Sequence, residues 1–217
     1  MAGRLGIVVV LAAMVASTAL AAPGDAERRA IARDDQAWAK RVNLVLRDLP
    51  SGFSQGPPTT SSPTGRTCPG FSPDLSRFTI TGEAVSRPFV RANGTSIFSA
   101  AEIFLSVADE RGDWALTARR EVLPCLRREL RQAAAGRAAA VTTTVLDSPR
   151  VGERSIWFRA GVRFDASGGA RTTIWLDVLG VARGRGDATL GVVSVRTPPS
   201  AALERTLLRK LASRLRG

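Results

Sequence analysis

The pattern of apolar and polar positions begins with an apolar run over residues 7–15. A short head carrying Arg4 precedes this run, and a tail of small residues over 17–21, ending Ala-Leu-Ala, follows it. A charged head, an apolar core of about ten residues and an A-x-A tail are typical of a secretory signal peptide. We therefore predict a signal peptide over 1–21 and a mature protein that works outside the cytoplasm. The alternative is an uncleaved N-terminal anchor.

Helical periodicity starts after a polar segment over 22–33, which we predict to be a mobile tail. Apolar residues then recur at spacings of three and four from Trp38 to Leu49, which indicates a helix that Pro50 ends. A stretch over 55–70, rich in Pro, Ser and Thr, predicts a loop.

A second helical pattern covers 109–135, with Asp109 as the candidate N-cap. Pro124 lacks an amide donor and must kink or split this stretch, so two helices meeting near Leu123 are expected. A final amphipathic helix follows Ser200, with leucines on one side and arginines on the other.

Alternating residues predict strands between the helices, and an Asn-Gly pair at 93–94 predicts a hairpin turn. Short connections favour antiparallel pairing. We therefore predict a single α+β domain over 34–217, with an antiparallel sheet of about five to seven strands flanked by helices. The expected strands cover 78–81, 84–89, 96–107, 139–146, 155–164, 172–181 and 188–196.

Cys68 and Cys125 are the two cysteines of the chain. An isolated pair in an exported protein usually forms a disulfide. Closing a loop of about 58 residues would stabilise the fold by roughly 4 kcal/mol through the entropy of the unfolded chain. The predicted bond would tie the 55–70 loop to the central helical region.

The charge and the missing residue types narrow the function. The formal net charge is +12, but the basic residues are scattered, and no strand combines them with aromatic residues as in single-strand nucleic-acid binders, so nucleic acid is not favoured as a partner. An anionic cell envelope would attract such a chain. The sequence contains no histidine, which excludes Ser-His-Asp catalysis and histidine zinc sites. Hydrolysis by paired carboxylates remains open.

The candidate ligand site is a groove between sheet and helices lined by Trp157, Trp175 and Phe164. Trp157 lies out of phase with its apolar neighbours and is expected to be half exposed. Arg185, between two glycines, could hold an anion, although a hairpin turn is the simpler interpretation.

Four acidic residues gather near residue 106 but lack the spacing and glycine of a calcium loop. We interpret them as helix-capping and solvated residues, and we predict no metal site and no cofactor. They are Glu102, Asp109, Glu110 and Asp113.

Several short marks resemble secreted actinobacterial sensor-like proteins. They are the strand-like stretch 96–104, the Cys125-Leu126 pair, the Gly-Glu-Arg-Ser entry at 152–155 and the Arg-Gly-Arg hairpin at 183–185. The family includes the extracellular domains of PknH-type receptor kinases and the LpqN-type lipoproteins. The resemblance implies a Mog1/PsbP-like fold, an antiparallel sheet flanked by helices, without catalytic activity.

The sequence therefore predicts a non-enzymatic extracytoplasmic binding or sensor-like domain. Its expected partner is an apolar or amphipathic envelope ligand or an envelope protein, with no membrane span after signal cleavage. The alternatives are a secreted hydrolase that uses carboxylates and a structural envelope protein.

Overall fold

The structure is a computed structural model that describes residues 25–58, 71–134, 137–165 and 171–216. The signal peptide predicted over 1–21 lies outside these residues. The strands are β1 (Arg28–Arg29), β2 (Phe53–Gln55), β3 (Thr79–Val85), β4 (Phe89–Arg91), β5 (Ser96–Phe104), β6 (Ala140–Val145), β7 (Arg154–Asp165), β8 (Arg171–Arg183) and β9 (Gly186–Val195). The helices are α2 (Arg33–Val42), the 3-10 helix η1 (Leu46–Asp48), α3 (Val107–Thr117), α4 (Val122–Ala133) and α5 (Ala201–Arg214).

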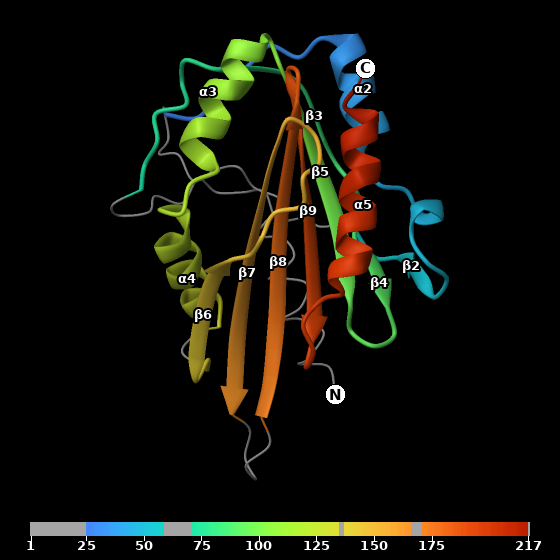
Figure 1. Cartoon of the computed structure of the whole chain (residues 1–217), viewed down its shortest axis with the longest axis vertical. Helices are drawn as coiled ribbons and strands as arrows, with labels where there is room; N and C mark the ends of the chain where they lie inside the picture. The colour runs from blue at the N-terminus through green and yellow to red at the C-terminus, as the bar shows by residue number, and fades with distance from the viewer. Residues whose placement is uncertain (1–24, 59–70, 135–136, 166–170, 217) are drawn as a thin grey trace.

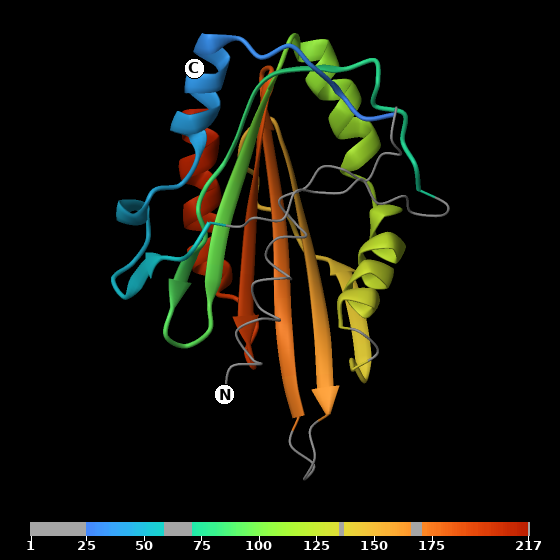
Figure 2. The same cartoon turned by 180° about the vertical axis from the view of Figure 1, so that it is seen from behind.

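These elements form a sheet with helices on both faces, which confirms the predicted α+β class (Figures 1 and 2). The strand order is β1-β3-β5-β9-β8-β7-β6, with β4 pairing β5 and β2 pairing β4. The sheet has nine strands rather than five to seven. The two unpredicted strands, β1 and β2, have two and three residues, which is too short to show an alternating pattern.

The segment predicted as a mobile tail is partly ordered by the sheet. Arg28 and Arg29 form β1, which pairs in parallel with β3, whereas the other strand pairs are antiparallel. The amide of Ala30 continues the pairing by donating to the Ile80 carbonyl at 2.9 Å. Backbone pairing needs no apolar side chain, so the polar sequence of this segment gave no indication of the strand β1.

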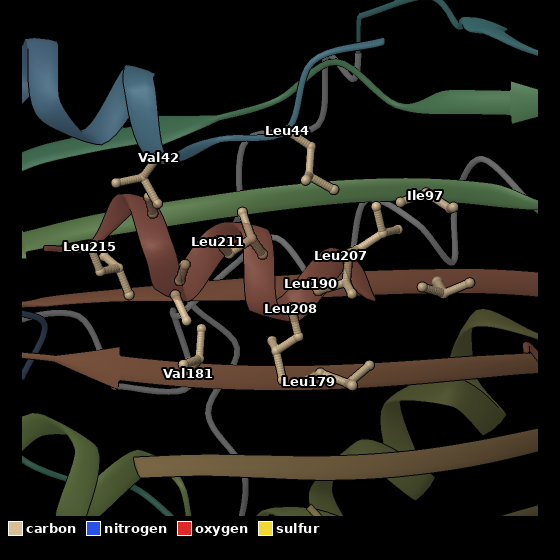
Figure 3. Packing of buried hydrophobic residues seen from close by; sticks show 14 of the residues in the cluster. Val42, Leu44, Ile97, Leu179, Val181, Leu190, Leu207, Leu208, Leu211 and Leu215 are labelled. Carbon is tan, nitrogen blue, oxygen red and sulfur yellow. The ribbon is translucent and has the colours of Figure 1, made fainter. Parts of the chain in front are cut away.

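One face of the sheet is covered by α2 and α5. Leucines of α5 recur on the side facing the sheet and pack against apolar residues of β8 and β9 (Figure 3). Ser200 caps α5 by accepting a hydrogen bond from the amide of Leu203 at 3.5 Å. The labelled members of this core from α5 and its neighbours are Val42, Leu179, Val181, Leu190, Leu207, Leu208, Leu211 and Leu215.

The opposite face of the sheet carries α3 and α4. Leu130 of α4 packs against Val162 and Leu176 of the sheet. In Figure 2 α4 lies in front of the sheet, whereas in Figure 1 α5 does. The sheet is therefore the middle of three layers.

The predicted split of the 109–135 stretch into two helices is confirmed, but three details of the helix boundaries differ from the prediction. The first helix ends at Val42, not Leu49, because the chain turns there and Leu44 enters the core. The cap of α3 is Ser106, which accepts from the amide of Asp109 at 3.0 Å. The break after α3 lies before Val122, so Pro124 falls in the first turn of α4, where its missing amide costs no helical hydrogen bond. Among the described residues, no helix has the length and apolar character needed to cross a membrane.

Candidate functional site

The register of β7 and β8 decides which of the predicted site residues meet. Trp157 lies opposite Leu179, and Trp175 lies opposite Gly161, so both tryptophans share the face that carries α5. Phe164 points to the other face, where it packs with the α4 core. The structure therefore brings the two tryptophans to one face and leaves Phe164 on the other.

Trp157 is buried rather than half exposed, with 2% of its surface accessible. Leu146 and Val151, from the connection between β6 and β7, pack against its cluster together with α5. The indole nitrogen donates to Asp177 Oδ2 at 3.0 Å. The alternation along β7 correctly predicted that Trp157 lies on the side opposite Ile156. It could not predict that the connection between β6 and β7 covers the ring.

Arg159 lies between the two tryptophans. Its guanidinium carbon is 6.0 Å from each ring centroid. Its Nε and Nη2 donate to the two carboxylate oxygens of Asp177 at 2.7 and 2.6 Å. Asp177 is fully buried, and these hydrogen bonds raise the pKa of Arg159. The guanidinium is therefore a fixed cation beside the rings.

A second carboxyl, Glu204 of α5, lies beneath this arginine. It is fully buried, and neither of its oxygens receives a hydrogen bond from a donor. Burial, followed by the charge of Asp177, raises the pKa of Glu204 to about 9. Glu204 is therefore protonated at neutral pH, and a neutral carboxyl can donate to Asp177.

Trp175 is the aromatic residue of this group that reaches solvent. It is partly exposed, and its indole nitrogen donates to the Arg196 carbonyl at 3.3 Å. Gly161 allows the ring to lie close to β7, since a Cβ there would be 3.0 Å from the ring carbon Cζ3. Thr142 and Thr144 of β6 are exposed opposite Gly161 and Arg159.

We name this surface the Trp175 face, formed by Thr142, Thr144, Arg159, Gly161 and Trp175. In Figure 1 the lower parts of β7 and β8 extend beyond the end of α5, with no described helix in front of them. The surface combines an aromatic ring, a fixed cation and two hydroxyl groups, which suits a ligand with both apolar and polar parts.

Arg185 does not belong to this surface. It occupies the tight turn between β8 and β9, as the turn interpretation predicted, and donates to the Asp35 oxygens at 2.7 and 2.5 Å. Its guanidinium also lies 5.1 Å from the Trp38 ring centroid. Arg185 therefore joins α2 to the sheet, and this pairing lowers the pKa of Asp35.

A second group of carboxyls lies under α3, where the sequence predicted capping and solvated residues. Glu110 is fully buried and Asp113 is 3% exposed, so their predicted solvation is wrong. Glu102 of β5 and Asp187 of β9 lie directly opposite each other on neighbouring strands, and Glu27 lies near them in the segment before β1. Among the described residues, no group of three or more such side chains could hold a metal ion.

Cys125 is buried on α4 and is not a free thiol. Its predicted partner, Cys68, lies outside the described residues, so the Cys68–Cys125 bond stays a prediction.

No protein-family model matches the chain, and no curated protein matches it. Among solved structures, it is similar to the extracellular domain of PknH from Mycobacterium tuberculosis, with a TM-score of 0.48 and 9% identity. The similarity covers 83% of this chain and 95% of that one.

Proposed function

We propose that this protein is a non-catalytic extracytoplasmic binding domain, sensor-like in character, that holds an amphipathic envelope ligand on the Trp175 face. The observation that carries the proposal is the partly exposed Trp175 beside Arg159, whose guanidinium is fixed by the buried Asp177. A ring and a cation that are already ordered lose little conformational entropy when a ligand binds.

The chemistry of the face favours an amphipathic ligand over a purely apolar one. An apolar part can stack on Trp175, while an anionic or hydroxylated part can contact Arg159 and the hydroxyls of Thr142 and Thr144. The chain has a net charge of +12, which would raise the local concentration of an anionic envelope component.

The buried carboxyls argue for binding rather than hydrolysis. Asp177 and Glu204 are the paired carboxyls next to the face, and neither is exposed. A glycoside hydrolase needs its two carboxyls on either side of the substrate bond. Here a substrate on the Trp175 face would contact Arg159 and Trp175 before either acid.

Native mass spectrometry of the protein purified from its own host tests the proposal. We expect wild-type protein to carry a bound small molecule that Trp175→Ala loses. The matched control is Leu105→Ala, which truncates a side chain that is 62% exposed outside the Trp175 face. Wild-type protein without ligand, or equal retention by both variants, would contradict the proposed site.

A further inference from the structure

The carboxyl group under α3 is built from separate parts of the chain. Glu110 and Asp113 are the buried residues of α3, so the helix presents two acids to the sheet where apolar residues are usual. Glu102 and Asp187 meet them from the sheet as a directly opposed cross-strand pair. Like charges placed directly opposite on neighbouring strands destabilise a sheet.

One basic group contacts the acids of α3 directly. Arg154 of β7 forms an ion pair with Glu110. Glu110 Oε1, Asp113 Oδ1 and Arg154 Nε nevertheless have no hydrogen-bond partner. A buried carboxylate oxygen without a donor is costly, but the cost falls when the carboxyl takes up a proton.

Other charged groups also face this cluster. Arg111 of α3 and Glu153, the residue before β7, act on Glu110, whereas Arg29 of β1 and Glu83 of β3 act on Glu27. The Thr117 hydroxyl donates to Asp113 Oδ2 at 3.3 Å. Acids therefore act on those of α3 from the N-terminal segment, β9 and the residue before β7, while Glu83 of β3 acts on Glu27.

We propose that α3 is a pH-sensitive helix, packed on the sheet in mild acid and opened locally as the pH rises through neutrality. The physical reason is that protons allow the clustered carboxyls to stay close together. When these protons dissociate, like charges remain beneath a helix whose fully buried side chains are both acidic.

The expected direction follows from burial and neighbouring charge. Burial, then the charge of Glu27, raises the pKa of Asp113 to about 7. Burial also raises the pKa values of Glu27, Glu110 and Asp187. Opening α3 returns these acids to water, where their ordinary pKa favours loss of the proton, so each raised pKa favours opening at higher pH.

Apolar contacts hold α3 in place while the acids are protonated. Trp114 lies over Gly180, where a Cβ would be 3.0 Å from the indole, and Gly112 lies directly against the Phe78 ring. These contacts do not titrate, so protonation decides whether they suffice to keep the helix packed.

Hydrogen exchange of the full chain, compared between pH 5.5 and pH 8 and corrected for the intrinsic exchange rate, tests this proposal. We expect the protection of α3 amides to fall on the order of thirtyfold if the Asp113 proton alone is linked to opening. The internal reference is α4, whose buried residues are Val122, Cys125 and Leu130.

Asp113→Asn should remove the share of this pH dependence that belongs to Asp113, about thirtyfold, because the amide keeps the shape of the side chain without its titration. The exposed Glu121→Gln, between α3 and α4, is the matched control and should behave as wild type. If Asp113→Asn does not fold, Glu102→Gln gives a second test, because it relieves the pair with Asp187 and should reduce the pH dependence of α3. Equal pH dependence of α3 and α4 in wild type, or unchanged pH dependence in the folded variant, would overturn the proposal.

Discussion

The two faces of the sheet bury acids with different partners. Under α5, Asp177 receives two hydrogen bonds from Arg159 and one from Trp157. Under α3, Glu110 is paired with Arg154, while Asp113 Oδ1 has no donor. The first arrangement fixes a cation beside a partly exposed residue, Trp175, whereas the second leaves carboxyl oxygens without donors, a feature that Glu204 of α5 also has.

The helices above these acids differ in the same way. Among the buried residues of α5, Glu204 is accompanied by three leucines, whereas those of α3 are two acids. Apolar burial is insensitive to pH, but a buried carboxyl is not. Both helices bury an acid of raised pKa, Glu204 in α5 and Asp113 in α3, but only α5 buries leucines beside its acid.

The largest expected difference between the two faces comes from replacing the arginine that pairs with a buried acid on each face, Arg159 or Arg154. Arg159→Met should lower the free energy of unfolding by about 3 kcal/mol, because it leaves Asp177 buried without its cation. Arg154→Met should cost roughly 1–2 kcal/mol, because the pKa of Glu110 is already raised and this carboxyl can take up a proton. Urea unfolding at pH 6 measures both values. A larger loss for Arg154→Met would contradict the expectation that Asp177 depends on its arginine more than Glu110 does.

Overall stability should fall as the pH rises from 5 to 8, by at least about 2 kcal/mol from Asp113 alone. A raised folded-state pKa means that the native state holds its proton after the unfolded chain has lost it. This stabilisation is complete below the ordinary pKa of the group. It disappears as the pH rises through the pKa of the group in the folded state. The lowered pKa of Asp35 acts oppositely, but only in stronger acid.

Glu204→Gln separates the contributions of the two faces to the pH dependence of stability. The amide removes the proton linkage under α5, so we expect the variant to gain stability relative to wild type as the pH rises toward 8. The pH dependence that remains belongs to the α3 side. Urea midpoints at pH 5, 6.5 and 8 measure this, and parallel profiles for variant and wild type would contradict the raised pKa of Glu204.

The smallest effect is expected from an acid at the rim of the α3 cluster. Glu83 pairs with Arg29 at 3.2 Å, and their side chains are 40% and 46% exposed. Glu83→Gln should therefore change the free energy of unfolding by no more than about 0.5 kcal/mol at pH 6. A loss above 1 kcal/mol, measured by urea unfolding, would mean that the cluster extends further into the surface than the buried residues indicate.

Periodicity predicted the elements with long repeating patterns. The leucines after Ser200 and the alternation along β5, β7, β8 and β9 were sufficient, because each pattern reports one buried face. The two-residue β1 was missed, since backbone pairing with β3 leaves no side-chain pattern. The helix end at Val42 was also missed, because the apolar spacing continues beyond α2 into a segment that contains the short 3-10 helix η1 and packs in the same core.

The candidate site was predicted only in part, because it depends on register. Trp157 and Trp175 were expected together, and the pairing of β7 with β8 places them on one face. Arg159 and Asp177 were not singled out, although both lie between the tryptophans at alternate positions. That spacing was the available signal, but scattered arginines and acids elsewhere in the chain gave no reason to select these two.

The sequence by itself determined the α+β class, the central strands and the leucine face of α5, because these follow from local periodicity. Tertiary structure alone decided which charges would be buried. Glu102 and Asp187 are far apart in the chain, and only the β5–β9 register places them opposite one another. The charge of a residue is local, but the water, cations and other acids around it are set by distant segments, so burial and pKa emerge only when the layers pack.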